Sequence, residues 1–315
     1  MPAQVFYVDF SADNSVRMAL GARGQRPPAP SVSTCMSLDD LDREIGAFLA
    51  AHDDPELMGA ALSICGWERD GVFEMPNHSY SIEREWIRTR LNVTRVHLVN
   101  DIVAAALAID LLDASELSIV SPGKPDPNRP KALIALGRSL GTTTVTTDEF
   151  GGAVAQPCVG GHCDLPATNA REIDVLRYLI KAFGHVSRVR AVSTTGIVNV
   201  YRALYDADGM VAAEHSAKDI VALARQGDAY AREAIGLVQG WLAATASDTL
   251  LAVGARGGIF LAGSFFTLMG DLFDEAAFMA RFTEKGRLSD MLKATPVYVV
   301  TAAEPEMIGL STLFN

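Results

Sequence analysis

Cysteine is scarce in this chain, with four residues among 315. Four cysteines do not form a disulfide framework in a chain of this length, so we expect reduced thiols. No run of about eighteen apolar residues occurs, which argues against a transmembrane helix. The N-terminus, MPAQVFYVDF, lacks the basic start and long apolar core of a secretory signal peptide. These absences predict a cytoplasmic protein with no membrane partner.

Positive charge is also in short supply, because 27 Lys and Arg residues face 38 Asp and Glu residues. The resulting net charge of -11 argues against nucleic acid or an anionic membrane as the general partner. Small anionic substrates are not excluded, since a site can be locally positive. With 49% hydrophobic residues, the chain is long enough for two domains and a large core.

The segment Val96–Ala108, VHLVNDIVAAALA, holds the first candidate for chemistry. A short apolar run predicts a strand that ends at Asn100-Asp101, and an alanine-rich stretch predicts a helix directly after it. A carboxylate at the end of a strand can lie in a cleft and accept a proton from a substrate hydroxyl. Alternatively, Asn100 or Asp101 only caps the helix.

A strand, a turn and a returning strand are predicted twice. The first unit begins with the strand Gln4–Asp9. The second begins with the strand Lys131–Leu136, and Gly137–Gly141 forms its turn. Between and after them, strands alternate with helices, including a helix predicted over Ser81–Leu91 with Ser81 as its cap. This pattern predicts α/β architecture with mixed sheets in two related halves that face each other across a cleft.

Several segments, taken together, resemble the bacterial glucokinases of the hexokinase–actin superfamily. They are LVNDIVAAALAI, GGHCDLPAT, HVSRVRAVSTTGIVNVYRAL, ARGGIFLAGSF and EKGRLSDMLKATPVYVVTAAEPEMIGL, and they follow the family's order over nearly the whole chain. The resemblance implies a two-domain actin-like (ribonuclease-H-like) α/β fold with a central cleft. We expect a small domain of residues 1–110 plus 297–315 and a large domain of residues 111–296.

The resemblance also implies ATP-dependent phosphorylation of glucose or a related hexose at its 6-hydroxyl, a reaction of carbohydrate metabolism. Asp101 falls on the family's general base, and Asn100, His162 and Asn77 fall on its sugar side. Asp9 falls on the aspartate that positions Mg²⁺ through water. The remaining residues expected at the nucleotide are Asn14, Gly137, Arg138, Gly141 and Gly263. Related glucokinases are typically dimers, which implies a homodimer.

The nucleotide loops depart from the family pattern. Where the family has Asp-x-Gly-Gly-Thr-Asn, this chain has Asp9-Phe10-Ser11-Ala12-Asp13-Asn14, so both glycines are missing and Asp13 adds a negative charge. The second loop, Ala135-Leu136-Gly137-Arg138-Ser139-Leu140-Gly141, keeps two of four glycines. Only glycine lets the backbone approach phosphate closely. Arg138 could bind an anion, or it could pair with Asp13 and close the site.

The sugar side departs as well, because Val159 and Val189 stand where the family has glutamates. We expect both valines to pack a partly closed cleft. Cys158, His162, Cys163 and Asp164 could hold zinc, although their spacing makes ordinary loop thiols the better interpretation. Two hypotheses follow: an ATP-dependent hexose kinase with Asp101 as base, or an inactive relative that acts as a ligand sensor or partner-binding regulator.

Overall fold

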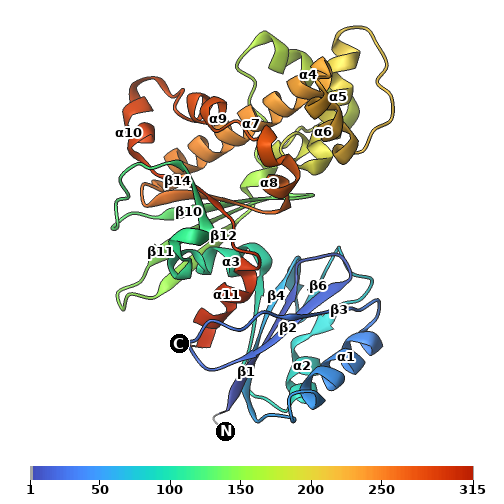
Figure 1. Cartoon of the computed structure of the whole chain (residues 1–315), viewed down its shortest axis with the longest axis vertical. Coiled ribbons are helices and arrows are strands. Elements are labelled where there is room, and N and C mark those ends of the chain that lie inside the picture. Colours follow the sequence, from blue (N-terminus) through green and yellow to red (C-terminus); the bar gives the residue numbers. More distant parts are fainter. Residues whose placement is uncertain (1–2, 315) are drawn as a thin grey trace. The chain divides into compact units, whose positions relative to one another are not determined.

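The computed structural model describes residues 3–314, and the chain divides into two compact units (Figure 1). The smaller unit takes the residues up to Asp113, residues 153–157 and the residues from Ala302 on. The larger unit takes residues 114–152 and 158–301.

A five-stranded sheet forms the centre of the smaller unit. Its order is β3-β2-β1-β4-β8. β1, β4 and β8 are parallel, while β2 and β3 extend the sheet antiparallel. The strands are β1 (Gln4–Phe10), β2 (Ser15–Gly21), β3 (Ser31–Thr34), β4 (Leu57–Ile64) and β8 (Val96–Asn100).

Alternation along β1 assigns its two faces to different helices. Phe6, Val8 and Phe10 pack in a cluster with residues of α1 (Leu38–Ala50) and α2 (Arg84–Leu91). Val5 and Tyr7 pack with residues of α3 (Asp101–Leu107) and α11 (Pro305–Leu310). Since side chains alternate across a strand, Asp9 follows Val5 and Tyr7 onto the face of α3 and α11.

The helix predicted over Ser81–Leu91 is shorter than expected. Ile82–Glu83 forms strand β7, and α2 begins only at Arg84 with Glu83 before it. β7 pairs with β6 (Val72–Glu74), which in turn pairs with β5 (Trp67–Arg69). Ile82 is fully buried opposite Phe73, so tertiary packing overrides the local capping signal of Ser81.

The larger unit is built on a six-stranded sheet in the order β12-β11-β10-β13-β14-β9, of which most of β12 is grouped with the smaller unit. The strands are β9 (Leu117–Ser121), β10 (Lys131–Leu136), β11 (Leu140–Thr147), β12 (Ala153–Cys158), β13 (Gly258–Ala262) and β14 (Val297–Val300). Its helices are α4 (Ala170–Phe183), α5 (Thr194–Ala207), α6 (Ala217–Gln226), α7 (Ala229–Val253), α8 (Ser264–Met269), α9 (Glu275–Phe282) and α10 (Ser289–Ala294).

The two sheets repeat one arrangement. In each, a central strand (β1 or β10) has an antiparallel hairpin partner on one side and a parallel strand on the other. The predicted pair of strand–turn–strand units is therefore confirmed. Val297–Val300 is a strand as predicted, yet it pairs with β13 and β9 in the larger unit, and only the residues from Ala302 on return to the smaller unit.

Helix α7 supplies the centre of the larger core. Trp241 is fully buried, and its indole N–H donates to the carbonyl of Pro166 at 2.7 Å.

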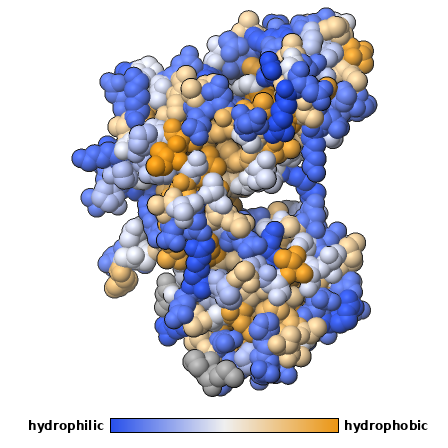
Figure 2. All heavy atoms as spheres, in the orientation of Figure 1, coloured by the Kyte–Doolittle hydropathy of each residue, from blue (hydrophilic) through white to orange (hydrophobic). Residues whose placement is uncertain are grey.

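Hydrophilic residues cover much of the visible face of each unit, with smaller apolar patches between them (Figure 2). Among the described residues, no helix has both the length and the apolar character needed to cross a membrane.

Candidate active site

Asn100 joins β8 to α3 and caps the helix. Its Oδ1 accepts from the backbone N–H of Ile102 at 3.2 Å, and its Nδ2 donates to the carbonyl of Gly66 at 3.0 Å. The side chain thus satisfies one of the free N–H groups at the helix start and ties that start to the segment that follows β4. The prediction that Asn100 caps the helix is confirmed. Asp101 is the first residue of the helix.

Asn100→Ala is expected to lower the free energy of unfolding by about 1–2 kcal/mol, because both the cap and the bond to Gly66 are lost. Urea denaturation followed by circular dichroism measures the change. Asn100→Asp keeps the cap oxygen and loses the donor, so it should fall between the two. Equal stability of Asn100→Ala and wild type would contradict this role.

Asp101 is a partly buried carboxylate at the carboxyl end of the parallel strands. Its Oδ1 accepts from the N–H of Ile102 at 2.9 Å. Burial raises the pKa of Asp101 to about 6, and the charge of Asp9 acts in the same direction. Hydrogen bonds from Ile102 and the Cys65 thiol oppose the shift. A carboxylate with a pKa near 6 is well suited to accept a proton at neutral pH.

Asp9 is buried, with 1% of its surface exposed, and both of its carboxylate oxygens accept hydrogen bonds. Its Oδ2 accepts from the Ser11 hydroxyl and from Nη1 of Arg17, both at 2.7 Å, while the Ser11 N–H donates to Oδ1 at 3.2 Å. Asp9 and Arg17 are directly opposed in the β1–β2 hairpin, so the sheet register fixes this ion pair. Arg17 was not among the predicted site residues.

Hydrogen bonds from other segments of the chain hold the loop after β1. Asn14 has a positive φ of 50°, and its carbonyl accepts from the N–H of Cys35. The Nδ2 of Asn77 donates to the carbonyls of Phe10 and Ser11 at 3.1 and 3.2 Å. Asn77, predicted on the sugar side, therefore supports the loop in this structure, although its buried Oδ1 has no hydrogen-bond partner.

Two glutamates of the C-terminal segment join this group, and neither was predicted from the sequence. Oε1 of Glu304 lies 3.8 Å from Nε of Arg17. Burial, with the charges of Asp9 and Asp101, raises the pKa of Glu306 well above its usual range. Nothing local marks these residues, because they lie about two hundred positions after Asp101.

In the larger unit, Gly137 and Gly263 follow the parallel neighbours β10 and β13. Gly263 has a φ of 104°, and a Cβ there would lie 2.1 Å from the carbonyl oxygen of Leu136. The two predicted glycines are thus brought side by side, with Ser264 next to Gly137. Arg138 is exposed at the hairpin tip, and Gly141 lies in β11.

His162 is exposed at the end of a short 3₁₀ helix, Gly160–His162. This segment is tied to the following loop by the bond from the N–H of Arg188 to the carbonyl of Cys163 at 2.9 Å. Arg188 is anchored in turn to Asp248 on α7 at 3.0 Å.

Both valines were expected to pack a partly closed cleft. This expectation is wrong for Val159, which is 76% exposed, whereas Val189 packs against the core.

Metal ligation is not supported by these donors. Within residues 3–314, no three His, Cys, Asp or Glu side chains gather as a metal site, so the zinc alternative at Cys158–Asp164 is wrong. Cys158 instead contacts the Thr142 hydroxyl at 3.0 Å. Mg²⁺ prefers carboxylates that also leave room for its waters. The buried Asp9, already bound by Arg17 and Ser11, does not fit such an ion.

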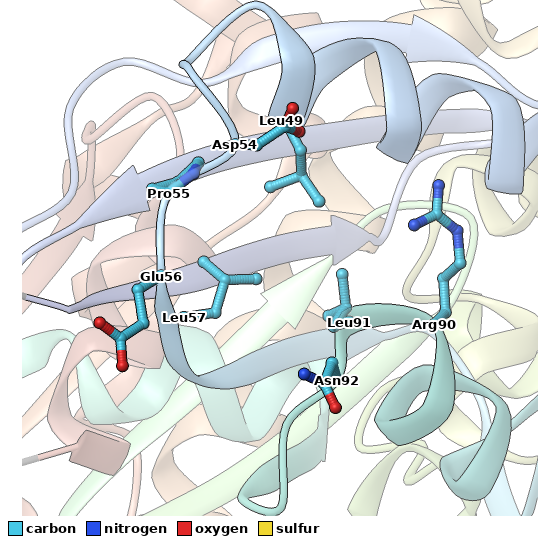
Figure 3. A pocket seen from close by; sticks show the side chains of 8 residues that line it. All are labelled: Leu49, Asp54, Pro55, Glu56, Leu57, Arg90, Leu91 and Asn92. Carbon is cyan, nitrogen blue, oxygen red and sulfur yellow. The ribbon is translucent and has the colours of Figure 1, made fainter.

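A surface pocket of about 360 Å³ lies elsewhere in the smaller unit (Figure 3). The side chains of Leu49, Leu57 and Leu91 point toward its middle. Leu57 begins β4, so this pocket lies at the opposite end of the strand from Gly66 and Asn100. None of the predicted site residues lines it.

Comparison with known proteins places the chain in one family. A family profile described as Glucokinase matches residues 15–315. A glucokinase-like protein of Caulobacter vibrioides is 33% identical over 298 residues, covering 95% of this chain and 93% of the relative. A glucokinase of Chromobacterium violaceum is 34% identical, covering 87% of this chain and 77% of the relative.

Solved structures agree on the fold. The crystal structure of a glucokinase from an Antarctic psychrotroph matches with a TM-score of 0.89 at 23% identity, covering 100% of this chain and 99% of that one. A Balamuthia mandrillaris glucokinase in complex with glucose matches with a TM-score of 0.79 at 19% identity, over 99% of this chain and 93% of that one. The chain has the actin-like fold of these sugar kinases, and it belongs to the glucokinase family.

Proposed function

We propose that this protein transfers the γ-phosphoryl group of ATP to the 6-hydroxyl of glucose or a closely related hexose. Family membership gives sugar phosphorylation as the reaction class. The single observation that carries the proposal is Asp101, a partly buried carboxylate with a pKa of about 6 at the start of α3.

In this proposal Asp101 acts as the general base. As the 6-oxygen attacks the γ-phosphorus, its proton passes to the carboxylate, and the bond between the γ-phosphorus and the bridging oxygen of ADP breaks. Asn100 fixes the helix start that carries Asp101. His162 and the backbone around Gly137, Gly141 and Gly263 are proposed to contact sugar and nucleotide respectively.

A coupled assay of the purified full chain tests the proposal. Production of ADP is followed with ATP, MgCl₂ and a panel of glucose, mannose, fructose and N-acetylglucosamine. We expect turnover on at least one hexose that the matched Asp101→Asn variant lacks. Absence of turnover on every sugar would refute the kinase proposal, and light scattering on the same sample tests the homodimer.

A second candidate function is a sensor without catalysis, and one observation favours it. The loop that lacks the family's glycines bonds to Asp9 through the Ser11 N–H, so that amide is not offered to a ligand. Sugar binding measured by calorimetry, without turnover in the assay above, would support this candidate over the kinase.

A further inference from the structure

Arg17 lies against Oδ2 of Asp9, on a side of the carboxylate that a metal ion would otherwise be free to bind. Its Nη1 lies 2.7 Å from Oδ2 of Asp9, a distance typical of charge-assisted hydrogen bonds. The same Nη1 donates to the Ser11 hydroxyl at 3.3 Å, and Ser11 donates to Asp9 through both its hydroxyl and its N–H. Asp9, Ser11 and Arg17 therefore form a closed hydrogen-bonded group.

The carboxyl groups around Asp9, Ser11 and Arg17 favour a positive charge at this place. Glu304 approaches the other side of the Arg17 guanidinium at 3.8 Å. Asp9 raises the pKa of both Asp101 and Glu306, while Arg17 lowers that of Glu306. The charges of Asp9, Asp101 and Glu306 thus act on one another, and Arg17 contacts Asp9 and Glu304 and acts on Glu306.

Arg17 and a divalent ion cannot share Asp9 at low cost. Like charges about 4 Å apart repel measurably even in water, and more strongly where water is excluded, as at a carboxylate with 1% of its surface exposed. Mg²⁺ also retains several waters, for which the buried carboxylate offers no room. Because Asp9 and Arg17 are directly opposed in the β1–β2 hairpin, a shift of the loop between the strands leaves their backbones beside each other.

We infer that Arg17 is the resident counter-ion of Asp9, and that divalent cations reach Asp9 only when this guanidinium is removed. The resemblance to the glucokinases assigned Asp9 to Mg²⁺, and the contacts of Asp9 assign it to Arg17 instead. The inference concerns metal binding in the absence of nucleotide, so it stands or falls independently of phosphoryl transfer.

Binding of Mn²⁺ to the full chain without nucleotide tests the inference, with free Mn²⁺ measured by electron paramagnetic resonance. Arg17→Met keeps the length and apolar stem of the side chain and removes its charge. We expect this variant to gain one Mn²⁺ site, with affinity at least roughly tenfold above wild type. Adding Asp9→Asn should remove the new site. Arg43→Met, an equal charge change at an exposed arginine on α1, should resemble wild type.

Two results would overturn the inference. One is Mn²⁺ binding by wild type that Asp9→Asn abolishes, which would show that Asp9 already holds metal beside Arg17. The other is a folded Arg17→Met variant that gains no site. If Arg17→Met does not fold, Arg17→Gln is measured in its place. The comparison of Mn²⁺ binding by wild type and by Asp9→Asn tests the inference without either of these variants.

Discussion

Asp101→Asn is expected to lower kcat by about a thousandfold, within the range by which a positioned general base accelerates proton transfer. Asparagine has nearly the shape of aspartate and can still accept from the Ile102 N–H, but it cannot take up the hydroxyl proton. The measurement is steady-state ADP production on the best hexose. KM should change little, because the lost interaction belongs to the transition state.

The same substitution is expected to stabilise the fold. Burial raises the pKa of Asp101 from 3.8 to about 6, so the ionised form is disfavoured in the native state. Wild type therefore loses stability as the pH rises from about 4 to about 6, and the full cost remains above pH 6. Asparagine does not titrate, so the variant should exceed wild type by about 1–3 kcal/mol at pH 7 and match it near pH 4.

The pH profile separates a base from a merely structural carboxylate. In wild type, kcat should fall as the pH drops below about 6, because the protonated Asp101 cannot accept the substrate proton. The residual activity of Asp101→Asn should lack this acid limb. Asp110→Asn, at an exposed aspartate of the same segment, serves as the control and should keep both rate and limb. A variant that is destabilised and retains its rate would contradict the assigned role.

The sequence predicts what depends on local pattern. The boundary between strand and helix at Asn100-Asp101, the strand at Val297–Val300 and the hairpin that begins at Asp9 are all present in the structure. Each is marked by a change of hydrophobic period or by a polar residue that caps a helix. The partner of Asp9 on the returning strand was not predicted, because only the register of the two strands identifies it as Arg17.

What the sequence does not predict depends on contacts between distant segments. Glu304 approaches Arg17, and Glu306 lies close enough to feel the charges of Asp9 and Asp101, in a segment where α11 packs against α3. No local sequence signal predicts that packing. Ile82 looks like a helical position until its pairing with Phe73 is known. Val159 was expected to be covered, yet loop residues gain burial only from neighbours that the sequence does not name.

The contact between α3 and α11 is also the place where a single methyl group should do most harm. A Cβ on Gly309 would lie 1.7 Å from the carbonyl oxygen of Ala104 and 3.0 Å from the backbone nitrogen of Ala108. Backbone atoms cannot rotate away as a flexible side chain can. Gly309→Ala must therefore push the two helices apart.

We expect Gly309→Ala to lower stability by about 3 kcal/mol, the upper part of the range for overpacked cores, despite the better helix propensity of alanine. Hydrogen exchange should show the loss of protection in α3 and α11, with α7 unchanged. Gly236→Ala on α7 is the matched control, because nothing lies within 4 Å of its added Cβ. That variant should be neutral or more stable by up to about 1 kcal/mol.

The rate of catalysis should also fall when α3 and α11 are pushed apart. α3 carries Asp101 at its first position, and a shift of about 1 Å in a reacting group can cost a hundredfold in rate. Gly309→Ala should therefore lower kcat by displacing Asp101, although Asp101 itself is not substituted. If Gly309→Ala keeps wild-type exchange protection and rate, α3 and α11 do not approach as closely as this, and the positioning of Asp101 by their contact is wrong.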